Sequence, residues 1–190
     1  MNGPPLNPAP IFEALNRHQV DYVLIGGYAA QQHGAERPTE DVDVTPANDL
    51  ENLGRLAAAL KDMGAGIRVD EIPEGLTFDT SAEALRGVKM LNLRTPHGDF
   101  DLTFAPAGVD GYSDLVRSAT PRNVDGVTVQ LASLADIIRS KDAAGRPKDA
   151  LALPELRRLA ALPTSVQPER EATPLPQKRN HSPSGPKQSR

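Results

Sequence analysis

The 190-residue sequence predicts an α/β fold of the α+β kind, built on a mixed β-sheet with flanking helices. Helical and strand-like hydrophobic patterns alternate through residues 10–162, which is typical of helices packed against a sheet. The strand patterns at 88–94 and 99–104 are separated by the turn sequence Thr-Pro-His-Gly, so we expect a hairpin there. A hairpin within an alternating chain indicates a mixed sheet rather than a purely parallel one.

The N-terminal elements follow from local patterns. A helix is expected over residues 10–18, because Pro10 suits the first turn of a helix and the apolar side chains that follow recur on one side. Residues 21–25 (DYVLI) predict a buried strand, since the run is apolar and rich in β-branched side chains. The glycines at 26–27 end this strand, and a short helix is expected over 28–33.

The next two elements have different periodicities. Residues 41–45 (DVDVT) alternate between polar and apolar side chains, as a half-buried strand does. Residues 48–63 carry leucines at helical spacing, and Asn48 is the expected N-terminal cap of this helix. These patterns predict a strand followed by an amphipathic helix.

The C-terminal elements complete the expected domain. Residues 127–131 (VTVQL) predict a further strand. Residues 133–143 predict a helix that Ser133 caps, with an acidic residue three positions later in a variant of the capping box. A proline opens the last helix, which is expected over residues 147–162.

Both ends of the chain differ in composition from the domain between them. Residues 1–9 are expected to form a flexible lead. Residues 163–190 contain only three hydrophobic residues but six of the 18 prolines, which is too little apolar surface to offset the entropy of ordering. We therefore expect a disordered, proline-rich basic tail, either a solubilising appendage or a contact for RNA or an acidic partner.

Composition excludes several classes of protein. The chain has no cysteine, which excludes a disulfide scaffold, a thiolate metal site and a cysteine nucleophile, and fits a reducing cytoplasm. It has neither a run of about 18 apolar residues nor a secretory signal, so no membrane contact is expected. The net charge of −4 combines +3 in the tail with −7 elsewhere, which excludes a strongly basic nucleic-acid surface on the domain.

Two carboxylates are expected on one face of the 41–45 strand. Successive side chains point to opposite faces, so Asp41 and Asp43 share one face while the valines that alternate with them face the core. Carboxylates about 6–7 Å apart repel each other unless a cation lies between them. Oxygen ligands on a rigid strand suit Mg²⁺ or Mn²⁺, which also bind substrate phosphates.

A third carboxylate is expected from the 99–104 strand, whose aromatic and leucine side chains form its buried face. Asp101 is flanked on both sides by core residues, so its position is better fixed than that of Asp99 beside the turn glycine. Three carboxylates on neighbouring strands can hold two divalent ions for an in-line displacement. Each motif alone also suits a solvent-facing strand, and only their combination favours a functional site.

The glycine pair Gly26-Gly27 stands where the first strand turns into a helix. The free backbone N–H groups of such a turn can receive phosphate oxygens, and the missing side chains allow close approach. A strand followed by two glycines and a helix is common, so this motif carries weight only beside the carboxylates.

The order and spacing of these motifs resemble the DNA polymerase β-type nucleotidyltransferase superfamily. Over about residues 20–105, VLIGG is followed by EDVDV and then by FDL, which is the order of that family's signature. The resemblance implies a polymerase β-like fold in which the glycine pair contacts nucleotide phosphates. It also implies that Asp41, Asp43 and Asp101 bind metal, and that Asp101 helps to deprotonate the acceptor hydroxyl.

Residues 134–156 resemble the closing segment of small bacterial nucleotidyltransferases of the abortive-infection (AbiEii-like) toxin branch, whose full-size members are longer. Lys141, Arg146, Lys148 and Asp149 occupy the places of that segment's basic and acidic residues. From the residues themselves, such cations can neutralise a triphosphate while Asp149 orients one of them. The same residues also suit a helix end and the cap of the next helix.

The resemblance implies a metal-dependent enzyme that moves a nucleoside monophosphate from a nucleoside triphosphate (NTP) to an acceptor hydroxyl and releases pyrophosphate. The acceptor stays open among RNA, a protein and a small molecule, and a toxin-like role would bring an antitoxin-like protein partner. The alternative is a non-catalytic nucleotide-binding or toxin–antitoxin module of the same fold. Arg37 and His33 are further candidates for substrate contact, although a lone histidine on a short helix is more often structural.

Overall fold

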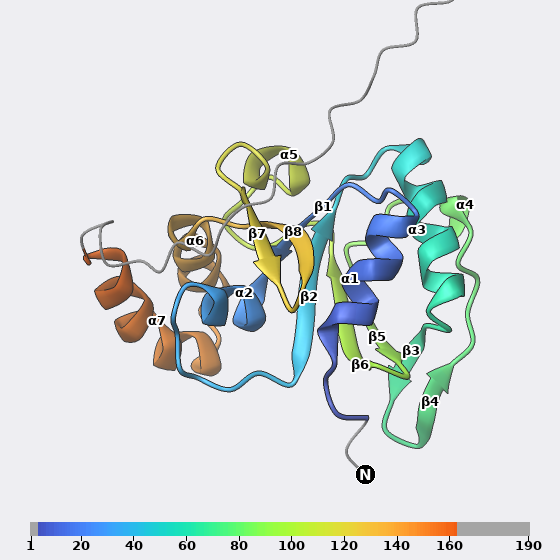
Figure 1. The fold of residues 1–190 in the computed structure, drawn as a ribbon, viewed down its shortest axis with the longest axis horizontal. Coiled ribbons are helices and arrows are strands. Elements are labelled where there is room, and N and C mark those ends of the chain that lie inside the picture. The colour runs from blue at the N-terminus through green and yellow to red at the C-terminus, as the bar shows by residue number, and fades with distance from the viewer. Residues whose placement is uncertain (1–3, 163–190) are drawn as a thin grey trace, which may run out of the picture.

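The strands of the protein form one mixed sheet in the order β4-β3-β5-β6-β2-β1-β8-β7 (Figure 1). The arrangement comes from a computed structural model, which describes residues 4–162. β2 runs parallel to β6 and β1 runs parallel to β8, whereas the other neighbours are antiparallel. The strands are β1 (Tyr22–Ile25), β2 (Asp41–Pro46), β3 (Gly66–Val69), β4 (Ile72–Leu76), β5 (Met90–Thr95), β6 (Gly98–Thr103), β7 (Thr120–Val124) and β8 (Val127–Leu131).

Seven helices accompany this sheet within residues 4–162. α1, α3 and α4 pack together on one side of the central strands, and α2, α6 and α7 lie on the other (Figure 1). The combination of a mixed sheet and flanking helices confirms the predicted fold class. The helices are α1 (Pro8–Arg17), α2 (Gly26–Gln32), α3 (Leu50–Asp62), α4 (Ala82–Leu85), α5 (Tyr112–Leu115), α6 (Leu134–Ala144) and α7 (Pro147–Ala160).

The central strands bury the apolar face that their alternation predicts. Val42 and Val44 of β2 and Phe100 and Leu102 of β6 are fully buried. Val42 pairs with Phe100 and Val44 with Leu102, so the buried side chains form continuous rows across the two strands. Full burial of such a side chain contributes about 1.5–3 kcal/mol. This packing fixes the register of the two strands and turns their carboxylates to the opposite face.

The expected β5–β6 hairpin is confirmed, and the N-terminal lead packs against it. The backbone N–H of Asn7 donates to the His97 carbonyl at 2.7 Å. Gly98 at the turn has φ +118°, and a Cβ on Gly98 would lie only 2.9 Å from Cα of Leu6. α1 begins at Pro8 rather than Pro10. The end of the expected flexible lead is therefore part of the folded domain.

Two expected element boundaries need correction, and five elements were not expected from the sequence. The cap of α3 is Asp49 rather than Asn48, because the Asp49 side chain accepts from the Asn52 N–H at 2.9 Å. The glycine pair belongs to α2, which begins at Gly26 instead of residue 28. Strands β3, β4 and β7 and the one-turn helices α4 and α5 had no expected counterpart. The Ser133 cap of α6 and the start of α7 at Pro147 are confirmed.

The proline-rich segment 163–190 lies outside the described residues, so its expected disorder stays a prediction. Among residues 4–162, no helix has the length and apolar character needed to cross a bilayer.

Candidate active site

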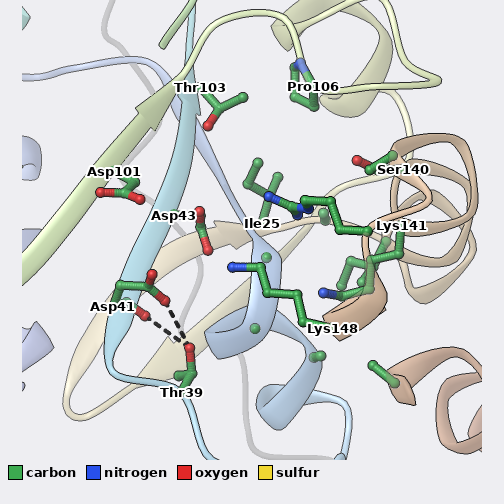
Figure 2. Close-up of a pocket in the computed structure, with 18 of the residues that line it drawn as sticks. Ile25, Thr39, Asp41, Asp43, Asp101, Thr103, Pro106, Ser140, Lys141 and Lys148 are labelled. Carbon is green, nitrogen blue, oxygen red and sulfur yellow. Dashed lines mark hydrogen bonds between the residues drawn. The ribbon is translucent and has the colours of Figure 1, made fainter. Parts of the chain in front are cut away.

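A cavity of about 750 Å³ opens between the sheet and the α6–α7 pair (Figure 2). Carboxylates of β2 and β6 form one wall, and lysines of α6 and α7 point toward them from the other side. The structure therefore brings residues together that lie more than 100 positions apart in the sequence. The sequence-predicted site residues that line this cavity are Gly26, Gly27, Asp41, Asp43, Asp101, Lys141, Arg146 and Lys148.

Asp43 and Asp101 are neighbours across the parallel strands β2 and β6. The register pairs Asp43 directly with Asp101, and the same row continues to Ile25 of β1 on one side and to Asn92 of β5 on the other. Adjacent strands lie about 4.8 Å apart, and paired residues project from the same face. The sheet thus presents two carboxylates side by side, with Asp41 on the same face of β2.

The pKa of Asp43 reflects the close approach of these carboxylates. Burial raises the pKa of Asp43 to about 7, and the nearby charges of Asp41 and Asp101 contribute in the same direction. Lys148 and Lys141 act in the opposite direction and lower this pKa. The lysines are therefore close enough to interact with the carboxylates across the cavity, but they do not balance them.

The glycine pair makes room for this cluster. A Cβ on Gly26 would lie 2.0 Å from Oδ2 of Asp43, and Gly26 has a φ of +74°. A Cβ on Gly27 would lie 2.7 Å from Oγ1 of Thr39. The backbone conformation and the space beside Asp43 therefore require glycine at position 26, and the space beside Thr39 favours it at position 27, independently of any phosphate.

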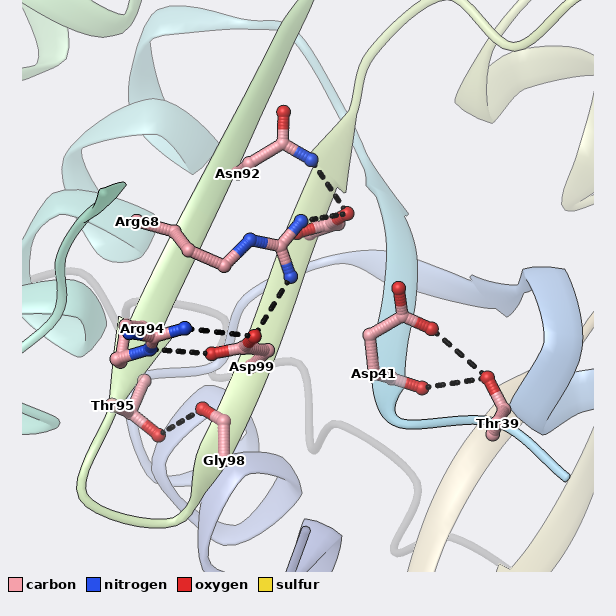
Figure 3. Close-up of polar contacts among 9 residues, drawn as sticks. Thr39, Asp41, Arg68, Asn92, Arg94, Thr95, Gly98 and Asp99 are labelled. Atoms are coloured by element: carbon pink, nitrogen blue, oxygen red, sulfur yellow. Dashed lines mark hydrogen bonds and ion pairs between the residues drawn. The ribbon is translucent and has the colours of Figure 1, made fainter. Parts of the chain in front are cut away.

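Thr39 links the glycine pair to Asp41. Its hydroxyl donates to Oδ1 of Asp41 at 2.9 Å, as the dashed lines in Figures 2 and 3 show. The same side chain packs on Gly27. Asp41 is therefore held by a neighbour only two residues before it in the chain.

Asp101 is held from the side of β5 and β3. Its Oδ2 accepts from Asn92 Nδ2 at 2.7 Å and from Arg68 Nη2 at 3.2 Å (Figure 3). Its Oδ1 is buried and has no hydrogen-bond partner within residues 4–162. Burial raises the pKa of Asp101, and the adjacent Arg68 and Asn92 only partly offset this effect. Oδ2 of Asp101 therefore accepts two hydrogen bonds, whereas Oδ1 accepts none within residues 4–162.

The choice between Asp99 and Asp101 as the third carboxylate is decided by their surroundings. Asp99 does not line the cavity, whereas Asp101 does. Asp99 accepts from Arg94 Nε at 2.8 Å and from Arg68 Nη1 at 3.0 Å. Despite burial, these two guanidinium groups hold the pKa of Asp99 below its usual range. Asp99 therefore forms ion pairs with Arg68 and Arg94 outside the cavity lining.

The cationic wall is organised around Asp149. The Asp149 side chain is completely buried and accepts from Lys141 Nζ at 3.0 Å and from Arg146 Nε at 2.6 Å. Burial raises the pKa of Asp149, but these bonds outweigh burial and leave that pKa below its usual value. Asp149 does not line the cavity, so its place is behind the two cations. Lys148 points toward Asp41 and Asp43 (Figure 2).

The donor set fits a divalent cation in its chemistry. All three groups are carboxylates, and the buried Oδ1 of Asp101 lacks a partner, which is the environment that Mg²⁺ or Mn²⁺ prefers. Within residues 4–162, however, no three His, Cys, Asp or Glu side chains are gathered closely enough to hold an ion. Metal binding would therefore require movement of the Asp41, Asp43 or Asp101 side chains.

Several lining residues were not found from the sequence. Arg68 and Asn92 reach the site through strand pairing, and neither belongs to a motif. Thr39 precedes Asp41 closely enough to be suspected as a partner of its carboxylate. Arg37 lines the cavity, whereas His33 does not and donates through Nε2 to the Ala132 carbonyl at 2.8 Å.

Comparison of the sequence with protein-family models and with curated proteins gives no match. Comparison of the fold with solved structures does. The lincosamide antibiotic adenylyltransferase LnuA, solved with lincomycin bound, is similar with a TM-score of 0.53 at 15% identity, over 82% of this chain and 99% of LnuA. The antibiotic-resistance factor ANT(2'')-Ia gives a TM-score of 0.49 at 20% identity, over 80% of this chain and 79% of that one.

The likeness to LnuA shows that the chain has a nucleotidyltransferase fold. At 15% identity this result concerns the fold alone. It agrees with the expected polymerase β-like architecture. The narrower resemblance to abortive-infection proteins stays a prediction, since LnuA is not described as a member of that branch.

Proposed function

We propose that the protein is a metal-dependent nucleotidyltransferase, which moves a nucleoside monophosphate from an NTP to an acceptor hydroxyl and releases pyrophosphate. The observation that supports this most directly is the register pair of Asp43 and Asp101, which faces Lys141 and Lys148 across one cavity. A wall of carboxylates opposite a wall of cations suits a substrate that carries several phosphates.

In this proposal the triphosphate lies between the two walls. Lys141, Arg146 and Lys148 neutralise its β- and γ-phosphates, and the buried Asp149 keeps Lys141 and Arg146 in place. The glycine pair lets the chain approach the phosphates closely, because no side chain intervenes.

The transfer step is an in-line displacement at the α-phosphorus. A bond forms between the acceptor oxygen and phosphorus while the bond from phosphorus to the bridging oxygen breaks, and pyrophosphate leaves with that electron pair. The hydroxyl proton passes to Oδ1 of Asp101, the unpaired oxygen of that carboxylate. Burial raises the pKa of Asp101, which makes its carboxylate a stronger base.

Asp41, Asp43 and Asp101 would hold Mg²⁺ or Mn²⁺ in this proposal. The ion would supply neutralisation of phosphate charge and a lowered pKa for the attacking hydroxyl.

A small molecule is the first acceptor class to test. A cavity of about 750 Å³ lies within the range of roughly 300–1,000 Å³ that is usual for small-molecule sites. LnuA, which shares the fold, is an adenylyltransferase of lincosamide antibiotics by its name. RNA and protein acceptors are tested in parallel. A toxin-like role predicts that the wild type inhibits cell growth and that a variant without transfer activity does not.

The decisive experiment incubates the purified chain with each α-labelled NTP, Mg²⁺ and a panel of small hydroxyl compounds, RNA and cell extract. We expect labelled product and pyrophosphate from the wild type and from the control Glu13→Gln, which changes an exposed residue of α1. Asp43→Asn and Asp101→Asn should each remove the transfer. Binding of the Mg²⁺–NTP complex by calorimetry without pyrophosphate release in any arm would favour the non-catalytic module instead.

A further inference from the structure

Arg68 of β3 lines the cavity, and its guanidinium spans two carboxylates of β6 (Figure 3). Nη1 donates to Oδ2 of Asp99 at 3.0 Å, and Nη2 donates to Oδ2 of Asp101 at 3.2 Å. Alternate residues of one strand lie on the same face about 6–7 Å apart. A guanidinium can bridge that separation because its nitrogens form a rigid planar fork, whereas a lysine ammonium is a single point of charge.

Asp99 is the fixed end of this bridge. Arg94 pairs with Asp99 across β5 and β6, and donates to Oδ1 from Nε at 2.8 Å and to Oδ2 from Nη2 at 3.3 Å. The Arg94 side chain is only 6% exposed, and neither member of this pair lines the cavity. Asp99 therefore holds Arg68 from behind the cavity wall, whatever Asp101 does.

Asp101 is the end of the Arg68 bridge that lines the cavity. Its Oδ2 receives two donors, Nη2 of Arg68 and Nδ2 of Asn92, while its Oδ1 receives none although it is buried. Two donors on one oxygen restrict rotation of the carboxylate about its last side-chain bond. Oδ2 is thereby directed toward β5 and β3.

We infer that Arg68 is a positioning residue, which together with Asn92 holds Oδ2 of Asp101 so that Oδ1 alone is presented to the reacting atoms. The inference deepens the proposed function and, in its kinetic part, rests on it. In this inference Arg68 acts through Asp101 rather than on the nucleotide or the acceptor, since Nη1 is bonded to Asp99 and Nη2 to Asp101.

A second explanation of the same contacts is purely electrostatic. Arg68 places one positive charge beside Asp101, next to Asp43, and so reduces repulsion between them. The two explanations differ for a lysine at this position. Lysine keeps the charge but loses the fork, so it preserves an electrostatic role and removes a geometric one.

The test is therefore Arg68→Lys, with two measurements. Steady-state transfer should show kcat reduced about 10–100-fold, the range typical for residues that orient a catalytic ligand. The KM for NTP should stay within about twofold, because Lys141, Arg146 and Lys148 are untouched. Mn²⁺ titration followed by electron paramagnetic resonance, without NTP, should show the dissociation constant for Mn²⁺ raised about tenfold or more.

The matched control is Arg157→Lys on α7, an exposed arginine whose partner is the exposed Asp142. It should match the wild type in both measurements. If Arg68→Lys has the kcat and the Mn²⁺ affinity of the wild type, the inference is overturned. Arg68 would then act only through its positive charge. A rise in the KM for NTP with unchanged kcat would also overturn it, because it would make Arg68 a nucleotide contact.

Asn92→Ala provides the second variant, because it removes the other donor to Asp101 and leaves the ion pairs of Arg68 in place. The same split between kcat and KM is expected, and circular dichroism checks that each variant is folded. If the wild type shows no transfer with any acceptor, the proposed function fails, and the Mn²⁺ titration still decides the inference. Unchanged Mn²⁺ affinity in both variants would then reject it.

Discussion

Gly26 leaves the space that Asp43 occupies: a Cβ built on this glycine would lie 2.0 Å from Oδ2 of the carboxylate. The glycine is the first residue of α2 and the aspartate stands in the middle of β2, paired with the last residue of β1. The turn and the carboxylate therefore depend on each other. A substitution at Gly26 acts on the site even though the glycine has no functional group.

Gly26→Ala should abolish transfer and destabilise the protein. The added methyl displaces Asp43, and the φ of +74° adds backbone strain of about 1–2 kcal/mol for a non-glycine residue. Gly126→Ala is the matched control, because Gly126 has a φ of +88° but no other group lies within 4 Å of the place that its new methyl would take. Chemical denaturation should show a larger loss for Gly26→Ala than for Gly126→Ala, and equal losses would contradict the steric link to Asp43.

Asp43→Asn should raise the free energy of unfolding in the absence of divalent ions while it removes transfer. Burial and the charges of Asp41 and Asp101 raise the pKa of Asp43 to about 7, so the ionised carboxylate is poorly accommodated. Removing one like charge at about 5 Å is worth roughly 1–3 kcal/mol at an effective dielectric constant of ~20. Urea titrations of the variant, the wild type and the exposed control Glu13→Gln measure this gain. A loss of stability would mean that the carboxylate makes net favourable contacts.

The faces of the central strands could be predicted because alternation alone determines them. In β2 and β6 each aspartate is flanked by a buried apolar side chain, and burial of Val42 and Phe100 fixes both faces and the register. The same reasoning gave Asp41, Asp43 and Asp101 as one group. It did not reveal that Asp43 and Asp101 are direct neighbours, because alternation does not say which strands pair.

The β3–β4 hairpin could not be predicted for a related reason. Its sequence contains Gly66, Pro73 and Gly75, which interrupt the alternation that marks a strand. Gly66 and Gly75 are instead required by close backbone contact, since a Cβ on Gly66 would lie 2.9 Å from the Gly75 carbonyl carbon. Arg68 was missed with the hairpin, because only strand pairing brings it to Asp101. Thr39 could have been predicted from the sequence, because its hydroxyl stands two residues before the Asp41 carboxylate.

Thr39→Val should reduce kcat about tenfold and leave the free energy of unfolding within about 1 kcal/mol of the wild type. Valine keeps the packing on Gly27 but removes the donor that bonds Oδ1 of Asp41 at 2.9 Å. Thr39→Ser retains the hydroxyl and should keep most of the activity. Steady-state kinetics of the two variants test this, and equal kcat values would show that the hydroxyl does not orient Asp41.

Asp149→Asn should weaken both the fold and nucleotide binding. The variant leaves Lys141 and Arg146 without their shared buried partner, at a cost of about 1–3 kcal/mol. The lower part of this range is expected for the contribution of Arg146, because that side chain is 56% exposed and solvent screens its charge. With both cations less well held, the dissociation constant for NTP should rise several-fold in calorimetry.

The acid stability of the protein tests the same contacts. Burial raises the pKa of Asp149, but the bonds from Arg146 and Lys141 leave it below the ordinary value of 3.8. A lowered folded-state pKa contributes stability that is fully present above the ordinary value and is lost as pH falls through the folded value. Urea titrations between about pH 5 and pH 2 should therefore show a shallower acid loss for Asp149→Asn than for the wild type. The exposed control Asp142→Asn should follow the wild type, and parallel curves for Asp149→Asn would show that the buried carboxylate is not stabilised by its two cations.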